Sequence, residues 1–175
     1  LGYILLGASL VTVAGFNASV LHLFNHALAK TALFLAVACL GMRFAKLRLE
    51  DLRGAGRQMP WTLTAFTIGA LSMIGVPPTA GFVSKWYILG GSLQAENYLA
   101  VFTLIGSTVL NAAYFLPIVY RAWLLPETAP PARDHGEAPW PMVLALTATA
   151  ALTLVFFLYN QPVLDLESQL VGRVK

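Results

Sequence analysis

This chain of 175 residues has the composition of an integral membrane protein: 58% of its residues are hydrophobic, 11% are charged, and its mean hydropathy is +0.71. Soluble domains carry roughly 25% charged residues, so we do not expect a soluble globular protein. The net charge of +3 combines 11 basic with 8 acidic residues. Five of the basic residues lie in one short loop, which indicates membrane orientation or contact with anionic lipid rather than nucleic-acid binding.

The first apolar segment, residues 1–13, is already under way at Leu1. No initiator methionine, basic leader region or small-residue cleavage site precedes it, so it does not resemble a signal peptide. We therefore interpret it as the tail of a transmembrane helix and expect the chain to be a C-terminal fragment of a longer protein.

A second apolar segment, residues 16–42, is about 40 Å long as a helix, enough to cross a hydrocarbon core of about 30 Å. Lys30 is the only formally charged side chain in the first 42 residues. It ends a polar stripe with His22, Asn25 and His26, since steps of four residues stay on one helix face. A lysine at the centre of a membrane costs roughly 2.5–3.5 kcal/mol, so we expect Lys30 to be functional.

The polar stripe predicts proton transfer through intervening water, because imidazoles donate and accept protons and a desolvated lysine releases its proton more readily. The alternative is that these groups only hydrogen-bond neighbouring helices. His22 and His26 have the spacing of a zinc-protease pair, but Leu23 replaces the glutamate of that motif. Haem ligation is disfavoured because the third histidine, His135, lies in a polar segment. We expect no metal and no cofactor.

Five basic residues lie between positions 43 and 57 and predict a cytoplasmic loop: Arg43, Lys46, Arg48, Arg53 and Arg57. Residues 60–93 follow, with no charge before Lys85. Two prolines and two glycines interrupt this segment: Gly75, Pro77, Pro78 and Gly81. Each proline deletes a backbone donor and frees the carbonyl facing it, so the segment is either a broken helix or two short helices.

Transporters place ion sites at such breaks, and Lys85 lies two turns after the prolines, within reach of freed carbonyls and water. The alternative is a tight turn at the membrane edge, with Lys85 extending to the interface. Whether residues 60–93 cross the membrane once or twice stays open at this stage.

The remaining sequence predicts a span over residues 97–122, an extramembrane connector over 124–139, and a last span over about 140–159 with a polar tail to residue 175. The expected fold is all-α: a polytopic transmembrane helix bundle with a Pro-broken helix. We expect residues 1–123 to form one transmembrane part and residues 140–175 the terminal helix and its tail.

Two motifs resemble the proton-translocating antiporter-like family shared by respiratory complex I and the multi-subunit sodium/proton antiporters. They are His22-Leu-Phe-Asn-His-Ala-Leu-Ala-Lys30 and Gly75-Val-Pro-Pro-Thr-Ala-Gly-Phe-Val-Ser-Lys85. The resemblance assigns proton relay to Lys30 and Lys85, matches His26 to the histidine one turn before the first lysine, and matches His22 to a further polar position. A third segment, Leu110-Asn-Ala-Ala-Tyr-Phe-Leu-Pro-Ile-Val-Tyr-Arg121, looks most like the D subunit of the cation/proton antiporters.

The resemblance implies the C-terminal half of a transporter subunit in a bacterial inner membrane, with no catalytic site of its own. Its partners would be other membrane subunits, the lipid bilayer, protons and, in an antiporter, sodium. The alternatives are a proton-pumping subunit of NADH:quinone oxidoreductase or a related hydrogenase, and a structural scaffold that tolerates neutral residues at positions 30 and 85. The family's N-terminal half has no counterpart here, so this segment alone should not transport.

Overall fold

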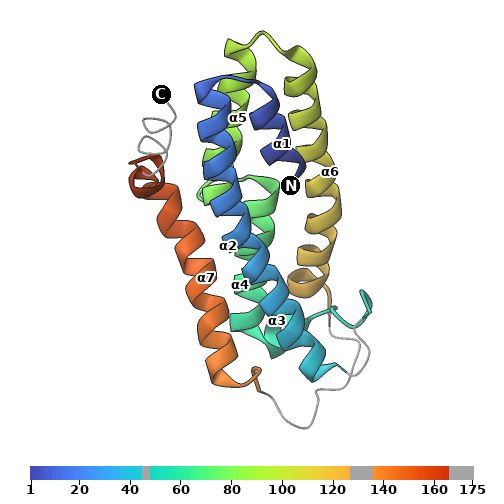
Figure 1. Ribbon diagram of the computed structural model, residues 1–175. Helices are drawn as coiled ribbons and strands as arrows, with labels where there is room; N and C mark the ends of the chain where they lie inside the picture. Colours follow the sequence, from blue (N-terminus) through green and yellow to red (C-terminus); the bar gives the residue numbers. More distant parts are fainter. Residues whose placement is uncertain (45–47, 127–135, 166–175) are drawn as a thin grey trace.

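The computed structural model describes residues 1–44, 48–126 and 136–165, and within these ranges every regular element is a helix. The helices are α1 (Gly2–Ser9), α2 (Val13–Arg43), α3 (Ala55–Gln58), α4 (Pro60–Ile74), α5 (Ala80–Gln94), α6 (Tyr98–Leu124) and α7 (Trp140–Leu158). They form an elongated bundle (Figure 1). The expected all-α fold is confirmed. Lys46, His135 and the tail from residue 166 lie outside the described residues.

Helix α2 is the central element of the bundle, in contact with α1, α4, α5 and α7. It begins at Val13, three residues before the expected Phe16, because the Thr12 hydroxyl accepts a hydrogen bond from the Gly15 N–H at 3.0 Å. The first apolar segment, expected to stay helical to residue 13, ends as α1 at Ser9, and α1 then packs beside α2.

Helices α4 and α5 together form one broken span. Each has 15 residues, or about 22 Å of helix, too short to cross a hydrocarbon core of about 30 Å alone. They follow one another in the same direction along the bundle, α4 in its lower half and α5 in its upper half (Figure 1). Residues 60–94 therefore traverse the bundle once, which decides the point that the sequence left open.

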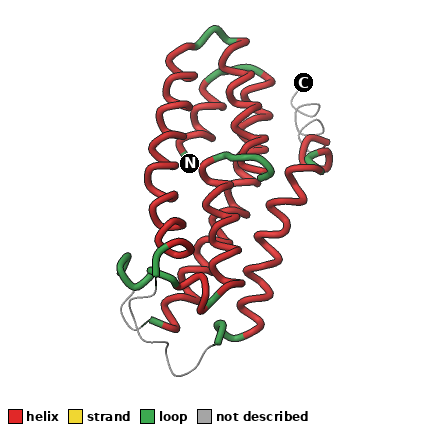
Figure 2. Tube along the Cα trace, turned by 180° about the vertical axis from the view of Figure 1, so that it is seen from behind, coloured by secondary structure: helices red, strands yellow, loops and turns green. Residues whose placement is uncertain are grey.

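This single crossing places four helix ends at the same end of the molecule. The end of α2, the start of α4, the end of α6 and the start of α7 all lie at the lower end, whereas the short turns before α2 and α6 lie at the upper end (Figures 1 and 2). The helix ends that the basic loop joins therefore share a side with those that the connector joins.

Small residues allow α2 and α4 to approach closely, as is common in membrane bundles. A Cβ atom added at Gly69 would lie 3.3 Å from the Ala29 carbonyl oxygen. Buried alanines of both helices belong to one hydrophobic core: Ala32 and Ala36 of α2 with Ala65 and Ala70 of α4. The resulting core is built mainly from alanine and leucine, and it fixes the position of the helix break relative to the polar face of α2.

Within the described ranges, three helices are long and apolar enough to cross a membrane: α2, α6 and α7. Helix α6 buries only Ala100, Leu104 and Ala122, and large apolar side chains such as Phe102 and Leu110 are exposed along it. These surfaces suit a lipid or protein environment, because they would be unfavourable in water.

Candidate functional site

The helix break between α4 and α5 leaves two carbonyl groups without their usual partners. In an uninterrupted helix, the Met73 and Ile74 carbonyls would accept hydrogen bonds from residues 77 and 78, but both are prolines and have no N–H. The helix instead ends at Gly75, which has a left-handed φ of 87° that glycine adopts without strain. Two backbone acceptors are thereby left inside the bundle.

Lys85 fills this gap with its ammonium group. Its Nζ donates to the Met73 carbonyl at 3.1 Å and to the Ile74 carbonyl at 2.9 Å. The third N–H is directed to Thr108 Oγ1 of α6 at 3.1 Å. Lys85 is only 7% exposed, so the side chain is held inside the bundle rather than extending to the interface.

The two glycines of the break make room for this arrangement. A Cβ atom at Gly75 would lie 2.7 Å from Cδ of Lys85, and one at Gly81 would overlap the Ser72 carbonyl oxygen. The Gly81 N–H also donates to the Ser72 hydroxyl at 3.1 Å. Gly81 therefore lets the start of α5 pack directly on the end of α4.

One part of the α2 stripe faces α5 and is buried. Asn25 is fully buried, and its Nδ2 donates to the Ala80 carbonyl at 2.9 Å. His22 Nδ1 lies 2.8 Å from the Ser84 hydroxyl, which itself donates to the Gly81 carbonyl at 3.1 Å. Since that hydroxyl proton is already used, we assign the proton of the His22 ring to Nδ1 and the lone pair to Nε2.

Both side chains keep an acceptor available. Among the described residues, His22 Nε2 and Asn25 Oδ1 are buried and have no hydrogen-bond partner. The two residues line a cavity of about 10 Å³ together with His26, Tyr3 and Met73. That volume is at the lower limit for a single water molecule.

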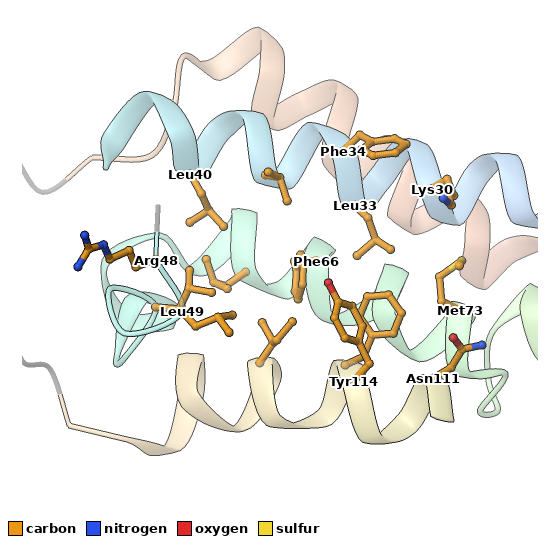
Figure 3. A pocket seen from close by; sticks show the side chains of 15 residues that line it. Lys30, Leu33, Phe34, Leu40, Arg48, Leu49, Phe66, Met73, Asn111 and Tyr114 are labelled. Carbon is orange, nitrogen blue, oxygen red and sulfur yellow. The ribbon is translucent and has the colours of Figure 1, made fainter. Parts of the chain in front are cut away.

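The other part of the stripe faces an open groove. His26 is half-buried, with its ring 5.6 Å from that of His22, and Lys30 is exposed with Nζ 5.4 Å from the Phe34 ring centre. Lys30 and Asn111 lie at one end of a groove of about 510 Å³ between α2, α4 and α6, and Arg48 lies at the other (Figure 3). A second groove of about 690 Å³, lined by α1 and α6, continues from Lys30 and Asn111.

The structure thus divides the predicted site residues between two surroundings. Lys85 and His22 are buried at the break, whereas His26 and Lys30 border the two larger grooves. Lys85 also lines a smaller groove of about 270 Å³ beside α6. Met73 belongs to both, because its carbonyl accepts from Lys85 and the residue also lines the groove of Lys30. Among the described residues, no hydrogen bond joins the two lysines directly.

Sequence reasoning did not single out Tyr3, Thr108 or Asn111. Thr108 and Asn111 carry a weak signal, since they are polar residues inside the apolar span 97–122, and they lie one turn apart. Tyr3 carried no signal, because a tyrosine near the end of an apolar segment is ordinary in a membrane protein.

Comparisons with known proteins agree with this architecture. Residues 1–111 match the family described as NADH:quinone oxidoreductase/Mrp antiporter, TM. The chain is 38% identical over 138 residues, 79% of its length, to NADH-quinone oxidoreductase subunit N of Desulforudis audaxviator, of which it spans 28%.

Two solved structures share the fold. The chain aligns with the Mrp complex from a Dietzia species at a TM-score of 0.83 and 26% identity, covering 95% of this chain and 39% of the other. It aligns with respiratory complex I from Thermus thermophilus at a TM-score of 0.73 and 27% identity, covering 94% and 36%. The chain therefore spans well under two thirds of the proteins that it resembles. On the match that includes both the stripe and the broken helix, this chain is a member of the NADH:quinone oxidoreductase/Mrp antiporter transmembrane family.

Proposed function

We propose that this chain forms the proton-carrying C-terminal part of a longer antiporter-like subunit, and that it translocates protons across a bacterial inner membrane within a multi-subunit complex. The observation that carries the proposal is the buried ammonium of Lys85 on the two carbonyls freed by the prolines. An ionisable group inside a membrane bundle is costly and usually marks an ion path. A scaffold would have no need of it.

The relay begins at Lys30, which borders the open grooves and takes up a proton there. His26 and His22 connect this residue with the break, through the cavity that has room for about one water molecule. The unpartnered Nε2 of His22 supplies a proton acceptor on this route. Lys85 is the next carrier.

The two lysines are coupled by their charges. Two ammonium groups in a low-dielectric region raise each other's free energy, so loading one favours release from the other. Lys30 is exposed and borders the groove that Asn111 also lines, whereas Lys85 is buried and held by three oxygen atoms. The proton thus passes between an exposed lysine and a buried one.

The proposal is tested in the full-length protein, assembled in its complex and studied in inverted membrane vesicles. We expect Lys85→Ala and Lys30→Ala each to reduce the initial rate of proton movement by about tenfold or more, since each removes a carrier. Arg57→Ala, an exposed cation outside the spans, is the matched control and should transport normally. Assembly is checked by co-purification of the other subunits. Transport at the control rate in either alanine variant would refute the role of that lysine.

The energy source separates two candidates for the complex. A sodium gradient should drive proton movement in a cation/proton antiporter, as the similarity to the Mrp complex suggests. Electron transfer from NADH to quinone should drive it in a respiratory complex, as the similarity to NADH-quinone oxidoreductase subunit N suggests. The segment from Leu110 to Arg121, which resembles the D subunit of the cation/proton antiporters, favours the antiporter, and we place that candidate first. If the complex moves protons with NADH but not with a sodium gradient, the order is reversed.

A further inference from the structure

Tyr3 lies against the buried end of Lys85. Its ring centre is 4.6 Å from Lys85 Nζ, within the range of a cation–π contact. The ring also meets the His22 ring edge-on, with centres 5.2 Å apart and planes at 74°. A residue of α1 therefore contacts a titratable group of α2 and another of α5.

The phenol group of Tyr3 is anchored on a third helix. Its oxygen accepts a hydrogen bond from Asn111 Nδ2 of α6 at 3.4 Å. Asn111 lies at the same end of the groove as Lys30, on the opposite wall with Met73 between them (Figure 3). The same side chain of Tyr3 thus contacts Asn111 through its oxygen and Lys85 through its ring.

Tyr3 also forms part of the boundary between the two surroundings of the site. It lines the small cavity beside His22 and Asn25, and it lines the groove that holds His26 and Lys30. Lys85 lines neither of them and instead lines a separate groove of about 270 Å³ together with Thr108 of α6. The Tyr3 ring thus contacts the Lys85 ammonium and also borders the groove of Lys30.

The chemistry of Lys85 explains why a ring is suited to this place. All three ammonium N–H groups already have oxygen partners, so a further polar partner would compete with the carbonyls. An aromatic face attracts a cation without needing an N–H, and the attraction is strongest where water is excluded. We propose that Tyr3 is a positioning residue whose ring face holds the Lys85 ammonium on the Met73 and Ile74 carbonyls.

A double-mutant cycle in the full-length chain tests the contact itself. Tyr3→Leu should lower the thermal unfolding midpoint at least twice as much when Lys85 is present as in the Lys85→Met background. In that background the Tyr3 ring has no cation to hold, so removing the ring costs less. Tyr114→Leu is the matched control: this tyrosine also lines the groove but packs on Phe115, and its substitution should cost the same in both backgrounds. Equal shifts for Tyr3→Leu in the two backgrounds would overturn the proposal.

The consequence for proton movement rests on the proposed function of Lys85 and is measured in the assembled complex. Tyr3→Leu should slow proton transport by about tenfold, which corresponds to the loss of a desolvated cation–π contact of roughly 1.4 kcal/mol. Tyr3→Phe keeps the ring, so its transport rate should stay within about twofold of the rate of the unmodified protein. A slow Tyr3→Phe variant, or a Tyr3→Leu variant at the control rate, would contradict the positioning role. If Lys85→Met itself transports normally, the proposed function fails, and the unfolding cycle alone still decides whether Tyr3 holds the ammonium.

Discussion

At the scale of single residues, the site depends on atoms that proline and glycine do not have. The prolines lack an N–H, so Met73 and Ile74 have free carbonyls for Lys85. The glycines lack a Cβ, so α5 can begin against the end of α4. A buried ammonium is tolerated because three oxygen atoms replace its hydration.

We predict that Gly81→Ala lowers stability and transport together. The added Cβ would meet the Ser72 carbonyl oxygen, a backbone atom that cannot rotate away, and overpacking of this kind costs about 1–3 kcal/mol. Gly90→Ala is the matched control on the same helix, because nothing lies within 4 Å of its Cβ position. Thermal unfolding of the full-length protein measures both. Equal midpoints for the two variants would show that α4 and α5 do not meet at Gly81.

At the scale of elements, the connector before α7 secures the first turn of α4. Glu137 accepts hydrogen bonds from the Trp61 N–H at 2.7 Å and from the Thr62 hydroxyl at 2.5 Å. The first N–H groups of a helix have no partner within it, and a carboxylate there is favoured by the helix dipole. This contact ties the start of α4 to the segment that leads into α7.

We predict that Glu137→Ala destabilises the protein by about 1 kcal/mol, the usual effect of losing a helix-capping acceptor. The thermal unfolding midpoint should fall, while proton transport per assembled complex should stay near normal, because Glu137 is not part of the relay. Glu50→Ala, which removes an exposed carboxylate in the basic loop, is the control and should leave the midpoint unchanged. A variant of Glu137 that is as stable as this control would contradict the capping role.

At the scale of the whole molecule, the single crossing of α4 and α5 determines the topology. The end of α2 and the starts of α4 and α7 lie at one end of the bundle, and the turn between α5 and α6 lies at the other (Figure 1). Basic loops are retained in the cytoplasm, so we expect the first end to be cytoplasmic and the turn to face the opposite side.

Single cysteines in a Cys39→Ala background test this topology. An impermeant thiol reagent should label Glu50→Cys and Gly136→Cys from the cytoplasmic side and Glu96→Cys from the other, since Glu50 precedes α4, Gly136 precedes α7 and Glu96 lies between α5 and α6. The native Cys39 is buried and is removed so that each protein carries one thiol. Labelling of positions 50 and 136 from opposite sides would mean that residues 60–94 cross twice.

The sequence by itself determined the membrane character, the positions of the spans within a few residues and the existence of the break. These features depend on local chemistry: hydrophobic length, proline without a donor, and glycine with a positive φ. The proximity of Lys85 to freed carbonyls also followed from spacing along the chain. The roles of Lys30, Lys85, His22 and His26 in proton relay remain predictions.

Only the tertiary structure decided which side of α2 each polar residue faces. Asn25 and His22 face α5 and are buried, whereas Lys30, on the same helix, borders an open groove. Helical spacing places residues on a stripe but cannot say which neighbour covers it. The contact of Tyr3 with Lys85 joins residues 82 positions apart and exists only because α1 packs beside α2 and α5. Such contacts are set by helix packing, which depends on the shapes of all the surfaces that meet, so no local pattern predicts them.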